Sequence, residues 1–169
     1  MVKGRSREFL QPSLLDRLTD EEPEKKSEPK ERRGLTQAKL RKSVLRDLNW
    51  LFNSSNLESV QSLEECPEIA NSVLNYGLPG FSGHTVSGID ALEIERLLKQ
   101  AICDFEPRIL RRTIKVRLNV DEQKMSHNAM TFDIEGELWA DPVPLHVYLK
   151  TELDLESGGI KIFDSIGAQ

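Results

Sequence analysis

The sequence predicts an α+β fold in which three N-terminal helices pack on a mostly antiparallel four-stranded β-meander. Up to Pro107, apolar residues recur at the three- and four-residue spacing of amphipathic helices. From Ile114 onward they alternate with polar residues, which is the pattern of strands with one wet face. Short turn-forming links join these strands, so we expect each strand to pair with the next.

Residues 1–19 are predicted to be a docking segment, and residues 20–34 a charged flexible linker that precedes the domain. Pro12 can occupy an early helical position, and Leu14, Leu15 and Leu18 then share one face of a short amphipathic helix. The linker has too few apolar residues to offset its ordering entropy. A helix this short is only marginally stable by itself. We therefore expect it either to dock on another chain or to fold back onto its own domain.

The folded domain is predicted to span residues 35–165. Thr36 is a suitable N-cap for the first helix, which should stop at the polar cluster that begins with Asn53. A second, short helix is expected from Pro67 to Asn75. The third helix ends at Pro107. Its apolar stripe is Leu92, Leu97, Leu98, Ala101, Ile102 and Phe105.

Strands are expected over residues 114–120, 132–140, 143–153 and 160–163, the last after a turn at 157–159. The charges on the wet faces of the first three strands predict their register, because opposite charges directly across strands stabilise a pairing. A tight turn at Asp141-Pro142 would join the second strand to the third. The predicted cross-strand pairs are Arg117–Glu135, Lys115–Glu137 and Lys150–Asp133.

The composition excludes several classes of protein. Lysine and arginine number 23 against 28 acidic residues, a net charge of −5 that argues against phosphate neutralisation on nucleic acid. No apolar run is long enough to span a bilayer or to make a secretion signal, so we expect no direct membrane insertion and a cytoplasmic location. Two cysteines, Cys66 and Cys103, fit a reducing compartment.

Few residues suggest chemistry, and we expect neither metal nor cofactor. The three histidines, His84, His127 and His146, lie far apart in the sequence, and no glycine-rich phosphate loop occurs. Ser82 and His84 are too close in one loop to form a nucleophile and base readily. The chain is therefore not expected to be an enzyme.

Carboxylates near the third helix leave a glycosidase as the alternative, although a solvated helix face is the favoured interpretation. Those carboxylates are Glu93, Glu95, Asp104 and Glu106. In the Glu106-Pro107-Arg108 segment, an extended backbone places both charges on one side. They either form an internal salt link that ties this helix to the first strand or contact another chain, and we favour the internal link.

Four motifs follow one another along the chain. They are Ser-Leu-Leu-Asp-Arg-Leu at 13–18, Asp-Leu-Asn-Trp-Leu-Phe-Asn-Ser at 47–54, Ser-Val-Leu-Asn-Tyr-Gly-Leu-Pro at 72–79 and Phe-Glu-Pro-Arg at 105–108. In this order they resemble the TssE subunit of the bacterial type VI secretion baseplate, a relative of the lysozyme-like wedge protein of contractile phage tails. The resemblance covers about residues 9–163. One departure lies at the end of the motif at 47–54: the family usually reads Leu-Leu-Asn-Thr-Arg there, whereas Ser55 stands here in place of the arginine.

The resemblance implies a non-catalytic subunit of a cytoplasmic, membrane-docked baseplate. Its partners would be the baseplate subunits TssF, TssG and TssK and the first ring of the sheath proteins TssB and TssC. An open meander fits such a role, because its edge strands can template a partner's strand. A peptidoglycan-cleaving glycosidase and an adaptor unrelated to secretion stay as alternatives. The predicted interaction residues are Leu14, Leu15, Leu18, Asn53, Glu106, Pro107 and Arg108.

Overall fold

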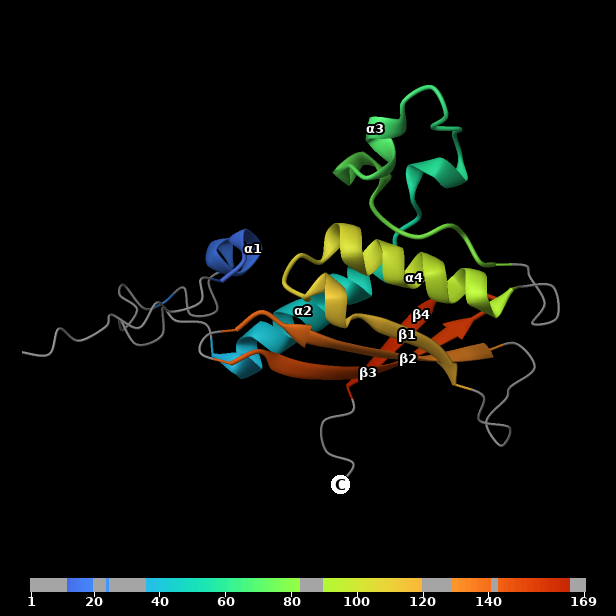
Figure 1. Cartoon of the computed structure of the whole chain (residues 1–169). Helices are drawn as coiled ribbons and strands as arrows, with labels where there is room; N and C mark the ends of the chain where they lie inside the picture. Colours follow the sequence, from blue (N-terminus) through green and yellow to red (C-terminus); the bar gives the residue numbers. More distant parts are fainter. Residues whose placement is uncertain are drawn as a thin grey trace, which may run out of the picture.

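The computed structural model describes residues 12–19, 24, 36–82, 90–119, 129–140 and 143–164. Within them the predicted α+β class is confirmed: helices accompany one antiparallel sheet in the order β1-β2-β3-β4 (Figure 1). The strands are β1 (Lys115–Asn119), β2 (Ala129–Leu138), β3 (Leu145–Asp154) and β4 (Ile160–Asp164). The helices are α1 (Leu14–Leu18), α2 (Gln37–Phe52), α3 (Pro67–Ala70) and α4 (Ala91–Phe105), with 3-10 turns η2 (Leu57–Ser59), η3 (Val73–Asn75) and η5 (Arg111–Thr113).

Helices α2 and α4 pack on one face of the sheet and enclose the core, while α3 lies on the side of α4 away from the sheet (Figure 1). The strands alternate between buried and less buried residues, as half-buried strands do. The fully buried side chains that dominate the core include Leu48, Leu51, Ile94, Leu98, Ile102, Phe132, Leu138, Leu149 and Leu153.

The ends of the two long helices follow from local capping chemistry. Thr36 caps α2 as predicted, because its hydroxyl accepts a hydrogen bond from the N–H of Lys39 (3.3 Å). Asp90 caps α4 in the same way, through the N–H of Leu92 (2.9 Å). Asn53 follows the last residue of α2, so the predicted stop is confirmed.

The predicted second helix is wrong as one continuous element. Helix α3 ends at Ala70 and a separate 3-10 turn begins at Val73. Ser72 causes the break, because its hydroxyl accepts a hydrogen bond from the N–H of Leu74 (3.2 Å) and donates one to the carbonyl of Ile69 (2.9 Å).

The predicted register is right between β2 and β3, where Lys150 lies opposite Asp133. It is wrong by two residues between β1 and β2. Lys115 lies opposite Glu135, and Arg117 lies opposite Asp133. A slip of two residues keeps every side chain on its own face and still pairs opposite charges, so the charge pattern could not separate the two registers.

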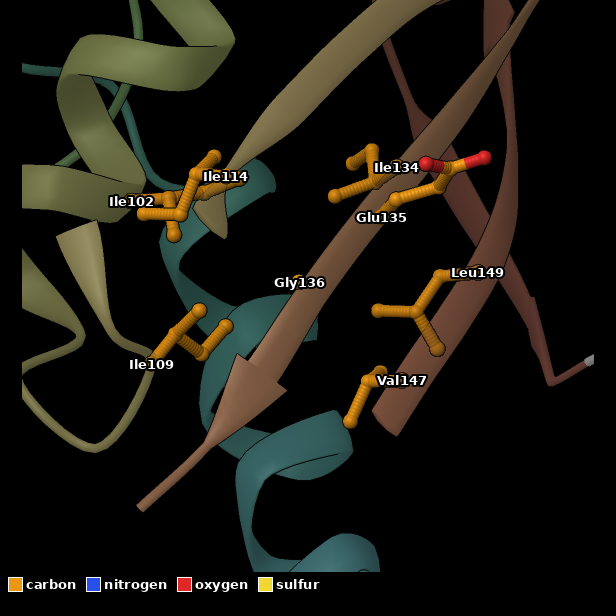
Figure 2. Close-up of a pocket in the computed structure, with 8 residues that line it drawn as sticks. All are labelled: Ile102, Ile109, Ile114, Ile134, Glu135, Gly136, Val147 and Leu149. Carbon is orange, nitrogen blue, oxygen red and sulfur yellow. The ribbon is translucent and has the colours of Figure 1, made fainter. Parts of the chain in front are cut away.

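Contacts made before β1 begins set the observed register. The N–H of Leu110 donates to the carbonyl of Glu137, and the N–H of Trp139 donates to the carbonyl of Arg108, both at 2.8 Å. Gly136 then lies beneath Ile109, where an added Cβ would come within 3.0 Å of the isoleucine Cγ2. Figure 2 shows the apolar side chains gathered around this glycine, about a void of only about 10 Å³. Because Gly136 has no side chain, Ile109 can pack directly on the backbone of β2.

Several expectations fall outside the described residues. They concern the linker apart from Glu24, the Asp141-Pro142 turn, His84 and His127. Of the helices in the described ranges, none has the length and apolar character needed to cross a bilayer. The same ranges contain no cluster of metal-ligating side chains.

Candidate interaction site

The second and third motif segments, 47–54 and 72–79, are joined by backbone hydrogen bonds beside the end of α2. The N–H of Leu78 donates to the carbonyl of Ser54 (2.8 Å), and the N–H of Asn56 donates to the carbonyl of Leu78 (3.1 Å). Gly77 has a φ of +123°, and a Cβ there would lie 2.7 Å from the carbonyl carbon of Ser54. Glycine is therefore required for this contact.

Tyr76 connects these two segments to the fourth motif, 105–108. Its ring meets that of Phe105 edge to face, with centroids 5.3 Å apart and an interplanar angle of 69°. Its hydroxyl donates to the carbonyl of Asp47 on α2 (3.4 Å). All three segments therefore meet along α2 next to Glu106.

Glu106 is buried, with 3% of its surface exposed, and it binds Arg108. The Nε of Arg108 donates to Oε1 of Glu106 (2.7 Å), and its Nη2 donates to Oε2. The backbone N–H of Arg108 also donates to Oε1 (3.1 Å). Pro107 between them is exposed. The favoured internal salt link is present, although it does not end on β1.

The other end of the Arg108 guanidinium binds α2. Its Nη2 donates to Oδ2 of Asp47 (2.6 Å) and its Nη1 donates to Oγ of Ser43 (2.9 Å). Burial lowers the pKa of Arg108, but the bonds to Glu106 and Asp47 outweigh burial and raise it above its ordinary value. Arg108 therefore stays charged and fastens the end of α4 to α2.

The same polar network continues to α1 through Asp16. Ser13 and Ser43 donate to Oδ2 of Asp16 at 2.6 and 2.8 Å, and Arg46 donates to Oδ1 at 2.5 Å. Burial raises the pKa of Asp16, but these three hydrogen bonds outweigh it and lower the pKa to about 2. Arg46 also bonds Asp47 (2.9 Å), so the carboxylates of Asp16 and Asp47 share one guanidinium.

The hydrogen bonds that attach helix α1 within the described part of the chain come from its polar side. None of its residues is buried, and Leu14, Leu15 and Leu18 are 69%, 41% and 75% exposed. The sequence predicts that this helix either docks on another chain or folds back onto its own domain. It lies on its own domain, yet its leucine face is uncovered within the described residues. We call Leu14, Leu15 and Leu18 the leucine face.

Asn53 binds the first residue of β4. Its Nδ2 donates to the carbonyl of Ile160, and its Oδ1 accepts from the N–H of Ile160, both at 2.9 Å. At the other edge of the sheet, Oε1 of Glu95 accepts from the N–H of Leu118 in β1 (2.6 Å). One side chain therefore caps part of each edge strand, a known way to limit unwanted strand pairing.

The carboxylates considered for a glycosidase have neighbours within the chain. Glu93 binds Arg96 (2.7 Å), Asp104 accepts from Gln100 (2.8 Å), and both oxygens of Glu106 bind Arg108. Ser82 is described, whereas its suggested partner His84 is not.

Sequence reasoning missed the four α1 and α2 residues of the network, which are Asp16, Ser43, Arg46 and Asp47. The sequence contained one indication of this network. Ser43 and Asp47 are four residues apart, so they share one helical face, and they lie next to the apolar stripe. Their partners are remote in the sequence, so only the folded chain brings them together.

Within the described residues, the chain is an α+β domain whose motif segments contact one another, with partly uncapped edge strands and an exposed leucine face. A family model described as baseplate wedge protein gp25 matches residues 38–143, well over half of the chain. The chain belongs to this family, and its role is that of a structural component that contacts other baseplate components. Searches of curated proteins and of solved structures gave no significant match.

Proposed function

We propose that this chain is the TssE-type wedge subunit of a type VI secretion baseplate. It would link TssF, TssG and TssK to the first sheath ring of TssB and TssC, in a membrane-docked cytoplasmic assembly. One observation carries the proposal: the motif segments from residue 47 onward contact one another inside the chain, while among the described residues the leucine face is exposed and the two edge strands are only partly capped.

The edge of β4 is available beyond the Asn53 cap. Gly159 accepts from the N–H of Asp154 (2.9 Å), so the backbone groups of Lys161 and Phe163 also face β3. The backbone groups of Ile160 and Ile162 then face the open edge of the sheet. Of these two residues, Asn53 binds only the backbone of Ile160. A partner strand can pair from Ile162 onward, which is β-augmentation.

The predicted interaction residues act in two ways in this proposal. Leu14, Leu15 and Leu18 would contact a partner directly, because their apolar surface is uncovered. Glu106, Pro107 and Arg108 would act from within, by holding α2 and through it α1. Asn53 would act by defining where strand addition on β4 begins.

The test is recovery of the native complex on the tagged full-length chain from cells that assemble the apparatus. We expect TssF, TssG and TssK with the wild type, and their loss when Leu14, Leu15 and Leu18 are all changed to Ser. A matched control changes three exposed apolar residues in another region to Ser: Val60, Val73 and Leu74. Recovery of none of these subunits with the wild type would overturn the proposal.

The enzymatic alternative has its own measurement. Purified peptidoglycan is incubated with the wild type and with Glu106→Gln, and released muropeptides are measured. The proposal predicts no release by either protein. Release by the wild type that disappears in Glu106→Gln would replace the structural role with a glycosidase.

A further inference from the structure

A groove of about 380 Å³ runs between α4 and the outer edge of β1, the two elements that lie one above the other in Figure 1. Basic side chains from both α4 and β1 line it, together with apolar side chains from each. The residues that matter are Arg96, Lys99, Lys115 and Arg117, with Leu92 and Val116.

The groove is basic although the whole chain carries a net charge of −5. Its one carboxylate, Glu95, is bound to the N–H of Leu118. Lys99 and Arg117 have no ion-pair partner among the described residues. Arg96 and Lys115 bind Glu93 and Glu135 in exposed pairs, which are weak and exchange readily with another anion.

The backbone of β1 offers a pairing site in the same groove. Because the N–H of Leu118 points outward to Glu95, the N–H and C=O of Val116, two residues earlier, point the same way. The side chains of Lys115 and Arg117 lie on the wet face of the sheet, whereas that of Val116 is buried on the helix face.

We propose that this groove binds an extended acidic–apolar–acidic segment of a partner protein as a fifth strand centred on Val116. The apolar residue would lie beside Val116 and Leu92, and the acidic residues would lie beside Lys115 and Arg117. Strand β2 already presents this pattern to the other side of β1, where Glu135, Ile134 and Asp133 face Lys115, Val116 and Arg117. This inference rests on the proposed assembly role and names one partner chemistry for it.

The test uses the full-length chain and a fluorescein-labelled peptide Asp-Val-Glu-Val-Asp-Val-Glu, with binding followed by fluorescence anisotropy. A second peptide has Lys at every acidic position. We expect the acidic peptide to bind the wild type, with an affinity that falls as salt is added, and the basic peptide not to bind.

Two double variants, each of which replaces two basic residues with Glu, change the net charge equally. They distinguish an effect of the groove from an effect of the overall charge. Lys115→Glu with Arg117→Glu reverses the two charges beside which the acidic residues would lie, and should weaken binding of the acidic peptide at least about tenfold. Arg111→Glu with Arg112→Glu alters two exposed residues of η5 that do not line the groove, and should change the affinity less than about twofold. Equal weakening in both variants, or no binding to the wild type, would overturn the proposal.

Amide hydrogen exchange locates the added strand. The acidic peptide should protect the N–H of Val116 and leave that of Ile162 unchanged. Protection of Ile162 alone would overturn this inference and leave the proposed baseplate role standing. Loss of TssF, TssG and TssK from the wild-type complex would overturn the baseplate role whatever the peptide does.

Discussion

The side-chain amide of Asn53 exchanges two hydrogen bonds with the backbone of Ile160, donating to its C=O and accepting from its N–H. The amide occupies the place that a peptide group of a neighbouring strand would take at the start of β4. The end of α2 is thereby joined to the last strand of the sheet.

Replacing Asn53 with Ala should lower the free energy of unfolding by about 1–2 kcal/mol, because both backbone groups of Ile160 lose their partner. Urea unfolding followed by circular dichroism measures the change. Asn49→Ala is the matched control on the same helix, because Asn49 is exposed and, among the described residues, its side chain makes only a 3.4 Å contact with Asn53. Equal stability of both variants would contradict the role given to Asn53.

Arg108→Ala should destabilise the domain by about 3 kcal/mol, because it leaves the buried Glu106 without its cationic partner. Adding Glu106→Gln to Arg108→Ala should restore part of the loss, since the buried charge is then gone. Arg96→Ala, which removes an exposed ion pair, is the control and should leave the urea midpoint unchanged. A loss below about 1 kcal/mol in Arg108→Ala would contradict a buried anchoring role.

Asp16 should titrate near pH 2 in the folded chain, below its ordinary value of 3.8. A lowered folded-state pKa means that Asp16 stabilises the attached state of α1 above pH ~3.8, and that this stabilisation is lost as the pH falls through about 2. Carboxyl ¹³C shifts measured against pH report the pKa directly. Ser43→Ala should move the pKa of Asp16 upward, and Ser59→Ala, on a distant exposed turn, should not.

Gly77→Ala should cost about 2 kcal/mol or more, because a Cβ would collide with the backbone of Ser54 and the φ of +123° disfavours any side chain. Gly80→Ala is the control, since nothing lies within 4 Å of a Cβ at that position. Thermal unfolding compares the two. A variant Gly77→Ala as stable as Gly80→Ala would mean that the loop moves away without cost.

Much of the fold could be predicted from the sequence because it depends on local rules. Helix α2 begins after Thr36 and ends before Asn53 through capping alone, and the alternation in β2 and β3 fixes which face is buried. The register of β1 could not be predicted this way, because Arg117 finds a carboxylate at either Glu135 or Asp133. The packing of Ile109 over Gly136 decides between them, and it is a contact between residues far apart in sequence.

The candidate site was predicted less completely. The ion pair between Glu106 and Arg108 follows from their spacing around Pro107, and the structure contains it. Its extension to Asp47, Ser43 and Asp16 joins three elements, and no local pattern indicates such partners. Periodicity placed the leucines of α1 on one face, but it could not reveal that the opposite, polar side makes the attachment.

The hydrogen bonds that hold α1 within the described residues come from charged and hydroxyl groups, for which water is an alternative partner. No residue of α1 is buried, so detachment of this helix removes none of its own side chains from the core. A partner protein can therefore bind the leucine face whether α1 is attached or detached, and the core domain need not unfold in either case.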